Sequence, residues 1–251
     1  MPTIAEQISS WMRRQAQAAG ARGFVVGLSG GVDSAVVVRL SQLALPGHVV
    51  GVIMPCHSDP RDEADAQLIA RQFDLPAVQV DLGTTYDPFV SRVNEATAQL
   101  PAGEASDDLR GRLALANVKP RLRMTTLFFV ANSLNYLVAG TGNRSEIAIG
   151  YYTKYGDGGV DLLPIGGLLK SEVRALGREL KVPDAILGKA PSAGLWLGQT
   201  DEGEMGFTYD DLERYLTGGP TTIAPALAMR VERLVRASEH KRALPPIPGL
   251  S

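Results

Sequence analysis

The segment Gly27–Ser34, which reads GLSGGVDS, combines residue types that bind phosphate. It follows a short apolar run typical of a strand and leads into a longer apolar stretch typical of a buried helix. A helix N-terminus presents free backbone N–H groups and the positive end of the helix dipole to an anion. Two adjacent glycines, Gly30 and Gly31, let the backbone approach a ligand closely. We therefore predict a phosphate-binding loop here, with a plain glycine-rich turn as the alternative.

Asp33 is an unusual residue for a phosphate loop, because a carboxylate repels bound phosphate unless a cation lies between them. A magnesium ion that bridges Asp33 and phosphate oxygens would remove this repulsion. The loop has neither the lysine of GxxxxGK[ST] nor the glycine spacing of GxGxxG. The residues therefore indicate a metal-assisted phosphate site of a different kind from these two.

The elements that position this loop are predicted to form an α/β fold. Near-continuous apolar runs, typical of parallel strands covered on both faces, occupy residues 24–28, 49–54, 77–80 and 136–139. Helical patterns occupy residues 33–45, 62–73, 117–134, 170–180 and 222–238. We expect a single domain over residues 1–251: a doubly wound, mostly parallel sheet with helices on both faces and a helical C-terminal extension. Pro120 is expected in the first turn of its helix.

Composition narrows the class of protein. Lys and Arg total 25 and Asp and Glu total 27, so the net charge of −2 gives no basic excess of the kind that nucleic-acid binders use. The single cysteine, Cys56, excludes an internal disulfide framework and a four-cysteine zinc site. The N-terminus lacks the features of a secretory or transit peptide, and no apolar run is long enough to span a bilayer. We expect no membrane partner, no nucleic-acid partner and a cytoplasmic location.

The string Ser29–Ser34 resembles the loop of the N-type ATP pyrophosphatases, which cleave ATP between its α and β phosphates and hold pyrophosphate in this loop. Within that superfamily the chain resembles the ammonia-dependent NAD synthetases over nearly its whole length. The segments that carry this resemblance are 117–124, 140–146, 150–162, 189–196 with 199–202, and 239–242. The resemblance implies an adenine nucleotide alpha hydrolase-like fold and a homodimer.

The resemblance also implies a role for each matching position. The positions matching ATP contacts are Gly27, Leu28, Ser29, Gly30, Gly31, Val32, Asp33, Ser34, Thr141, Lys170 and Ser192. The metal positions are Asp33 and Glu146, for magnesium. The positions matching contacts to nicotinic acid adenine dinucleotide (deamido-NAD) are Arg121, Lys154, Asp161, His240 and Lys241. Taken alone, Lys170 and His240 would be ordinary surface side chains, and Glu146 would be a solvated loop acid.

The residue types suit the reaction that the resemblance implies, the formation of a C–N bond. The nicotinate carboxylate attacks the α-phosphate of ATP, pyrophosphate leaves, and ammonia then attacks the adenylated carboxyl to give NAD and AMP. Arg121 and Lys154 suit the anions of the dinucleotide, and Lys170 suits the departing pyrophosphate. Asp161 is a candidate to bind ammonium and accept its proton.

Free ammonia is the expected nitrogen source, although a separate glutaminase subunit stays possible. Glutamine-dependent members carry an N-terminal amidase-like domain with a cysteine nucleophile, whereas only a short segment precedes Phe24 in this chain. Two alternatives remain at this stage. One is another ATP pyrophosphatase, such as a GMP synthetase core or a tRNA-modifying enzyme. The other is a non-catalytic adenine-nucleotide-binding module, which would have no use for the Lys154–Asp161 segment.

Overall fold

A parallel sheet in the order β3-β2-β1-β4 forms the centre of the fold. The computed structural model describes residues 2–98, 108–192, 194, 196 and 199–249. The strands are β1 (Phe24–Leu28), β2 (Val49–Ile53), β3 (Ala77–Gln79) and β4 (Leu137–Val138). The helices before and beside the sheet are α1 (Ile4–Ala18), α2 (Val32–Ala44), α3 (Pro60–Gln72), α4 (Gly83–Thr97) and α5 (Asp108–Leu134). The later helices are α6 (Arg144–Ile149), α7 (Lys170–Glu179), α8 (Asp184–Leu187), α9 (Asp201–Met205), α10 (Tyr209–Gly218), a 3-10 turn (Pro220–Thr222), α11 (Pro225–Ala237) and α12 (Glu239–Arg242).

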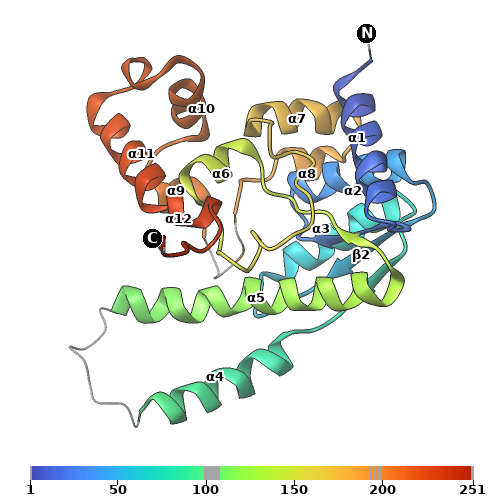
Figure 1. Cartoon of the computed structure of the whole chain (residues 1–251), viewed down its shortest axis with the longest axis horizontal. Coiled ribbons are helices and arrows are strands. Elements are labelled where there is room, and N and C mark those ends of the chain that lie inside the picture. The colour runs from blue at the N-terminus through green and yellow to red at the C-terminus, as the bar shows by residue number, and fades with distance from the viewer. Residues whose placement is uncertain (1, 99–107, 193, 195, 197–198, 250–251) are drawn as a thin grey trace.

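The alternation of side chains along β1 explains why helices cover both faces of the sheet. Phe24 and Val26 point into one apolar layer, which α1, α2, α3 and α7 complete. Val25 points into the opposite layer, which α4 and α5 complete. Figure 1 shows α4 and α5 together along one side of the molecule, away from α1, α2 and α7. The predicted α/β fold with a parallel sheet is confirmed.

The predicted helices and strands differ from the structure at several points, and the helices α1, α4 and α10 were not predicted. The prediction for Pro120 is wrong: α5 spans Asp108–Leu134, and Pro120 lies inside it, beyond its first turn. Packing against α4 stabilises the part of α5 that precedes the proline, where local propensity predicts no helix. This packing includes a hydrogen bond from the Tyr86 hydroxyl to the Leu115 carbonyl. The strand predicted over 136–139 is reduced to two residues in β4, followed by an isolated parallel bridge between Ala139 and Leu162. Helix α6, which follows, was not predicted.

The C-terminal helices form a second, smaller apolar cluster. Its members come from α6 and from the segment 205–231, and they include Met205, Phe207 and Leu212. The end of α6 lies directly against the end of α11, because a Cβ at Gly150 would lie 2.1 Å from the Ser238 Cβ. Gly150 also has a φ of +68°, which a residue with a side chain adopts only with strain. The expected helical extension is therefore present, and it packs beside the region after β4.

The described part of the chain contains no helix with the length and apolar character that crossing a bilayer would require.

Candidate active site

The phosphate loop, Gly27–Ser34, connects the end of β1 to the start of α2 as predicted. The N-cap of α2 is Gly31, which has no side chain to occupy the first N–H groups of the helix. Hydrogen bonds inside the loop fix its shape: the Ser29 hydroxyl lies 3.2 Å from the Ser34 hydroxyl, which donates to the Gly31 carbonyl at 2.9 Å. Gly30 has a φ of +77°. The loop therefore has the geometry of a preformed anion site.

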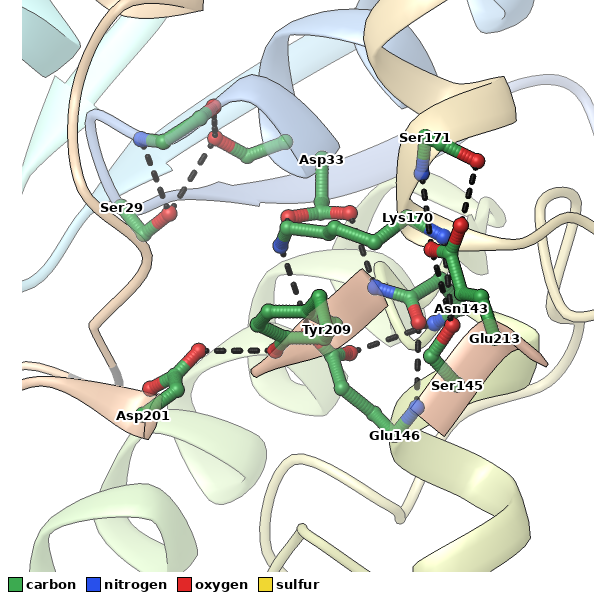
Figure 2. Close-up of polar contacts among 12 residues, drawn as sticks. Ser29, Asp33, Asn143, Ser145, Glu146, Lys170, Ser171, Asp201, Tyr209 and Glu213 are labelled. Atoms are coloured by element: carbon green, nitrogen blue, oxygen red, sulfur yellow. Dashed lines mark hydrogen bonds and ion pairs between the residues drawn. The ribbon is translucent and has the colours of Figure 1, made fainter. Parts of the chain in front are cut away.

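The two predicted metal ligands, Asp33 and Glu146, converge on one ammonium group. Lys170, at the start of α7, forms ion pairs with the Asp33 carboxylate and, at 3.3 Å, with Glu146 Oε1. The Lys170 side chain is only 5% exposed. Asn143 completes the arrangement, since its amide donates to Asp33 Oδ1 at 3.1 Å and its side-chain oxygen caps α6 at Glu146. Figure 2 shows these side chains pointing toward one another beside the phosphate loop. We call Asp33, Glu146 and Lys170 the Lys170 cluster.

The charges of the Lys170 cluster do not balance, because two carboxylates share one ammonium. Burial, opposed by the attraction of Lys170 and reinforced by the nearby Asp33 carboxylate, raises the pKa of Glu146 to about 7. Burial alone would lower the pKa of Lys170, but the Asp33 and Glu146 carboxylates outweigh it and raise that pKa. Lys170 is therefore a permanent cation, and the cluster has room for further positive charge.

The donor set fits a hard divalent cation. Asp33 and Glu146 supply oxygen ligands of the type that magnesium takes, and the phosphate oxygens of a bound nucleotide would supply others. Among the residues that the structure describes, no three His, Cys, Asp or Glu side chains gather into a metal site of their own. A metal here would therefore depend on ligands from the nucleotide or water as well as the two carboxylates.

Tyr209 and Asp201 are site residues that the sequence did not reveal. The Tyr209 ring lies 5.4 Å from the Lys170 ammonium, and its hydroxyl donates to Asp201 Oδ2 at 2.9 Å. The same hydroxyl lies 3.4 Å from Glu146 Oε1. Burial, followed by the Glu146 and Asp201 carboxylates, raises the pKa of Tyr209, so it stays a hydrogen-bond donor. In the sequence, only the motif 199–202, which includes Asp201, pointed to this part of the site. The contacts of Tyr209 with Lys170 and Glu146 depend on how α10 packs against α6 and α7.

Four of the predicted dinucleotide contacts lie together: Arg121, Lys154, His240 and Lys241. We call Arg121, Lys154 and Lys241 the cation group, and His240 contributes its backbone carbonyl. The Arg121 guanidinium donates to the Lys154 carbonyl at 3.4 Å, and the Lys154 ammonium donates to the His240 carbonyl at 2.5 Å. The Lys241 ammonium donates to the carbonyls of Gly150 and Tyr152, both at 2.6 Å. Burial lowers the pKa of Lys241. The structure thus joins residues from α5, the loop after α6 and α12.

The remaining predicted residues lie in three different segments. Thr141 is in the segment between β4 and α6, beside Asn143. Ser192 is exposed and accepts a hydrogen bond from the Gly194 amide at 3.1 Å. Asp161 is exposed, and its carboxylate accepts from the Val138 amide at 2.7 Å, which fixes it at the end of β4. The ligand contacts assigned to these three residues stay predictions.

Comparison with known proteins identifies the family to which this site belongs. Residues 4–245 match the family described as NAD synthase. The chain belongs to the NAD synthase family. It is 52% identical over 245 residues to the NH(3)-dependent NAD(+) synthetase of Carboxydothermus hydrogenoformans. The alignment covers 98% of this chain and 96% of that relative. The resemblance inferred from the motifs is thereby confirmed, as is the class of enzyme, a ligase.

Solved structures of NAD synthase relatives share the fold over nearly the full length. An NMN synthetase from Francisella tularensis superposes with a TM-score of 0.88 at 34% identity, covering 98% of both chains. An NH3-dependent NAD synthetase from Campylobacter jejuni superposes with a TM-score of 0.78 at 27% identity, covering 98% of this chain and 97% of that one. Family membership therefore supports an enzyme of the NAD synthetase type.

Proposed function

We propose that this chain catalyses the ATP- and magnesium-dependent amidation of deamido-NAD by ammonia, forming NAD, AMP and pyrophosphate. The observation that supports this most is the Lys170 cluster, which lies beside a preformed phosphate loop. A relative with 52% identity is named for the ammonia-dependent reaction. A non-catalytic nucleotide-binding module would not need two partly buried carboxylates that converge on one lysine.

The proposed first step is transfer of the adenylyl group to the nicotinate carboxylate. The open N-terminus of α2 and the amides of the phosphate loop bind the anionic phosphates. Lys170 donates to the pyrophosphate as its charge grows, and Thr141 and Ser192 contribute hydroxyl contacts. Magnesium held by Asp33 and Glu146 would neutralise charge on the phosphate oxygens. No protein nucleophile is required, because this chain acts by positioning and charge stabilisation.

The proposed second step is attack of ammonia on the adenylated carboxyl, with release of AMP. The cation group lies where three separate segments meet, and its charges suit the pyrophosphate of the dinucleotide. Asp161 is exposed while its carboxylate is anchored at the end of β4, so it can hold an ammonium ion and accept its proton. The Val138 amide occupies only Oδ2 of Asp161 in this geometry.

A mononucleotide substrate is the second candidate. The NMN synthetase from Francisella tularensis superposes with a higher TM-score, 0.88, than the Campylobacter NAD synthetase, 0.78. Nicotinic acid mononucleotide carries the same reacting carboxylate as deamido-NAD but lacks the AMP half. The same protein site could therefore act on it with the same chemistry.

One assay separates these functions. The protein is incubated with ATP, MgCl2 and ammonium chloride together with either deamido-NAD or nicotinic acid mononucleotide, and the amide product is quantified by chromatography. We expect a kcat/KM for deamido-NAD at least about tenfold higher, because only the dinucleotide uses the whole cation group. A preference for the mononucleotide would establish the second candidate, and no amide from either substrate would refute both.

Ammonia rather than glutamine is the expected nitrogen donor of the purified chain. At fixed total ammonium the rate should rise with pH, because the fraction present as free ammonia grows. Initial rates across a pH series with ammonium or glutamine test this. Amide formation from glutamine by the isolated chain would contradict the assignment. If a separate glutaminase subunit supplies ammonia, glutamine should support amide formation only after that subunit is added.

Replacement of Asp161 by alanine should slow amide formation more than adenylation. Without the carboxylate, the bound ammonium ion has no acceptor for the proton that it must lose before ammonia can attack, and we expect a roughly 10²-fold lower rate of the second step. Pyrophosphate release and NAD formation are measured separately in single turnovers. Equal loss in both steps would mean that Asp161 only holds the dinucleotide, and NAD formation at the wild-type rate would exclude either role.

We also propose a homodimer, located in the cytoplasm. Apolar side chains on the outer surfaces of α4 and α5 are exposed, among them Phe89, Val93 and Phe129, the last 73% exposed. Several exposed large apolar side chains on neighbouring helices are typical of an interface between protein subunits. Figure 1 shows the two helices projecting from the rest of the chain.

The dimer is tested by light scattering. The wild-type protein should have twice the chain mass of 26.8 kDa, and Phe129→Glu should lower it to one chain. Met229→Glu is the control, because Met229 is also on a helix and is 71% exposed but lies on α11. A wild-type monomer with full activity would contradict the proposal.

A further inference from the structure

A second ion cluster, formed by Lys189, Asp62 and Asp65, lies next to the phosphate loop. The Lys189 ammonium lies 2.8 Å from Asp62 Oδ1 and 2.5 Å from Asp65 Oδ2. The two carboxylates are on the first turns of α3, and Lys189 follows α8. Burial lowers the pKa of Lys189, but the hydrogen bonds to Asp62 and Asp65 outweigh it and raise that pKa, so the lysine is charged.

Asp62 and Asp65 also contact the phosphate loop. A Cβ at Gly30 would lie 2.4 Å from the Asp62 carbonyl oxygen and 2.9 Å from the Asp65 Cβ, so the loop backbone packs directly on α3. On its other side Asp62 faces the turn that contains Ser192, because a Cβ at Gly194 would lie 3.5 Å from Asp62 Oδ2. Asp62 therefore lies between the phosphate loop and the Ser192 turn.

The Ser192 turn is held at two points along the chain. Lys189 attaches it to α3, and the Pro191 carbonyl accepts from the Asp201 amide at 3.1 Å. Inside the turn the Ser192 hydroxyl accepts from the Gly194 amide. Since only two residues separate Lys189 from Ser192, fixing the lysine restricts where the hydroxyl can lie.

We propose that Lys189 is a positioning residue for ATP: its ion pairs with Asp62 and Asp65 hold the Ser192 turn against the phosphate loop, so that the Ser192 hydroxyl can contact the nucleotide phosphates. This inference rests on the proposed use of ATP. It assigns Lys189 a function through Ser192 and not a contact with the reacting atoms. The dinucleotide side of the site, formed by the cation group, does not depend on it.

Because these ion pairs are partly exposed, a role of Lys189 in positioning can be distinguished by experiment from a role in fold stability. The Lys189 and Asp62 side chains are 27% and 26% exposed, and ion pairs at such positions contribute little to stability. Loss of the lysine should therefore leave the melting temperature nearly unchanged while it weakens ATP binding. A residue that only stabilised the fold would instead lower the melting temperature and affect both substrates alike.

The test compares Lys189→Met with the wild-type protein. We expect the KM for ATP to rise about tenfold while the KM for deamido-NAD changes less than twofold. Calorimetry with α,β-methylene-ATP and MgCl2 should show a similar loss of affinity without any reaction. Lys189→Arg should restore most of it. If Lys189→Met does not fold, Asp65→Asn, which removes one of the two ion pairs and keeps the side-chain shape, should raise the KM for ATP in the same direction.

Arg61→Met is the matched control. Arg61 forms an ion pair with Asp59 at the same end of α3, and its side chain is 85% exposed. This substitution removes a cation from the same helix terminus without touching the Ser192 turn, so the KM for ATP should not change. An equal rise in Arg61→Met and Lys189→Met would show a general charge effect and would overturn the proposal.

The double variant decides whether Lys189 acts through Ser192. If it does, Lys189→Met combined with Ser192→Ala should raise the KM for ATP no further than Ser192→Ala alone. The inference would be overturned if the two substitutions had multiplicative effects on the KM for ATP, or if the KM for ATP in Lys189→Met were within twofold of wild type. In either case, amide formation by the wild-type enzyme would still support the proposed function. A wild-type protein that neither binds the analogue nor forms amide would refute the proposed function itself.

Discussion

Replacement of Lys170 by methionine is expected to lower kcat roughly 10³-fold, the largest effect of any single substitution in this site. Methionine keeps most of the apolar side-chain length but removes the ammonium group that lies between Asp33 and Glu146. The departing pyrophosphate then loses its cationic donor. Steady-state rates of pyrophosphate release with saturating ATP and dinucleotide measure the change, and a kcat within threefold of wild type would exclude Lys170 as a catalytic residue.

The same substitution should also destabilise the free protein. Two carboxylates would remain in a largely buried site without their counter-ion, which costs about 3 kcal/mol when one partner of a buried ion pair is removed. Chemical denaturation measures this loss. If Asp33 and Glu146 are metal ligands, added MgCl2 should recover part of the stability in Lys170→Met and have less effect on wild type. Lys181→Met, an exposed position just beyond α7, is the control and should change neither stability nor rate.

Local sequence patterns predicted the part of the site that is contiguous in the chain. The strand before Gly27 and the helix after Gly31 were predictable because a buried parallel strand and a buried helix each have a distinctive apolar pattern. Asp33 was predicted as a metal ligand because a carboxylate in a phosphate loop needs a cation. Lys170 and Glu146 were assigned through resemblance to a family, and the structure then placed both beside Asp33.

Long-range packing accounts for what the sequence did not reveal. Tyr209 has the pattern of an ordinary helical residue, and its contact with Lys170 exists only because α10 packs against α7. Pro120 lies inside α5 because packing against α4 outweighs local helix propensity. Lys189 was part of a recognised motif, but only the structure shows that its partners are on α3. Each of these three cases depends on a contact between segments that are distant in the sequence.

Asp33→Asn and Glu146→Gln should each lower turnover roughly 10²-fold at a fixed magnesium concentration. Both substitutions remove a ligating charge and keep the side-chain size. The fold should survive, because an amide oxygen can still accept from Asn143, as Asp33 Oδ1 does, or close the cap of α6, as Glu146 does. Asp210→Asn, an exposed acid on α10, is the control and should have wild-type activity.

The magnesium dependence of these two variants distinguishes metal binding from the positioning of Lys170. If the carboxylates bind magnesium, the concentration that gives half-maximal rate should rise at least about tenfold in each variant, and high MgCl2 should restore part of the activity. Calorimetric titration of MgCl2 into the protein with α,β-methylene-ATP gives the same comparison without turnover. A reduced kcat with an unchanged magnesium midpoint would mean that Asp33 and Glu146 act only by holding Lys170. Full activity of both variants at wild-type magnesium concentrations would remove the metal assignment altogether, because two carboxylates that converge on one ammonium would then serve only to stabilise the fold.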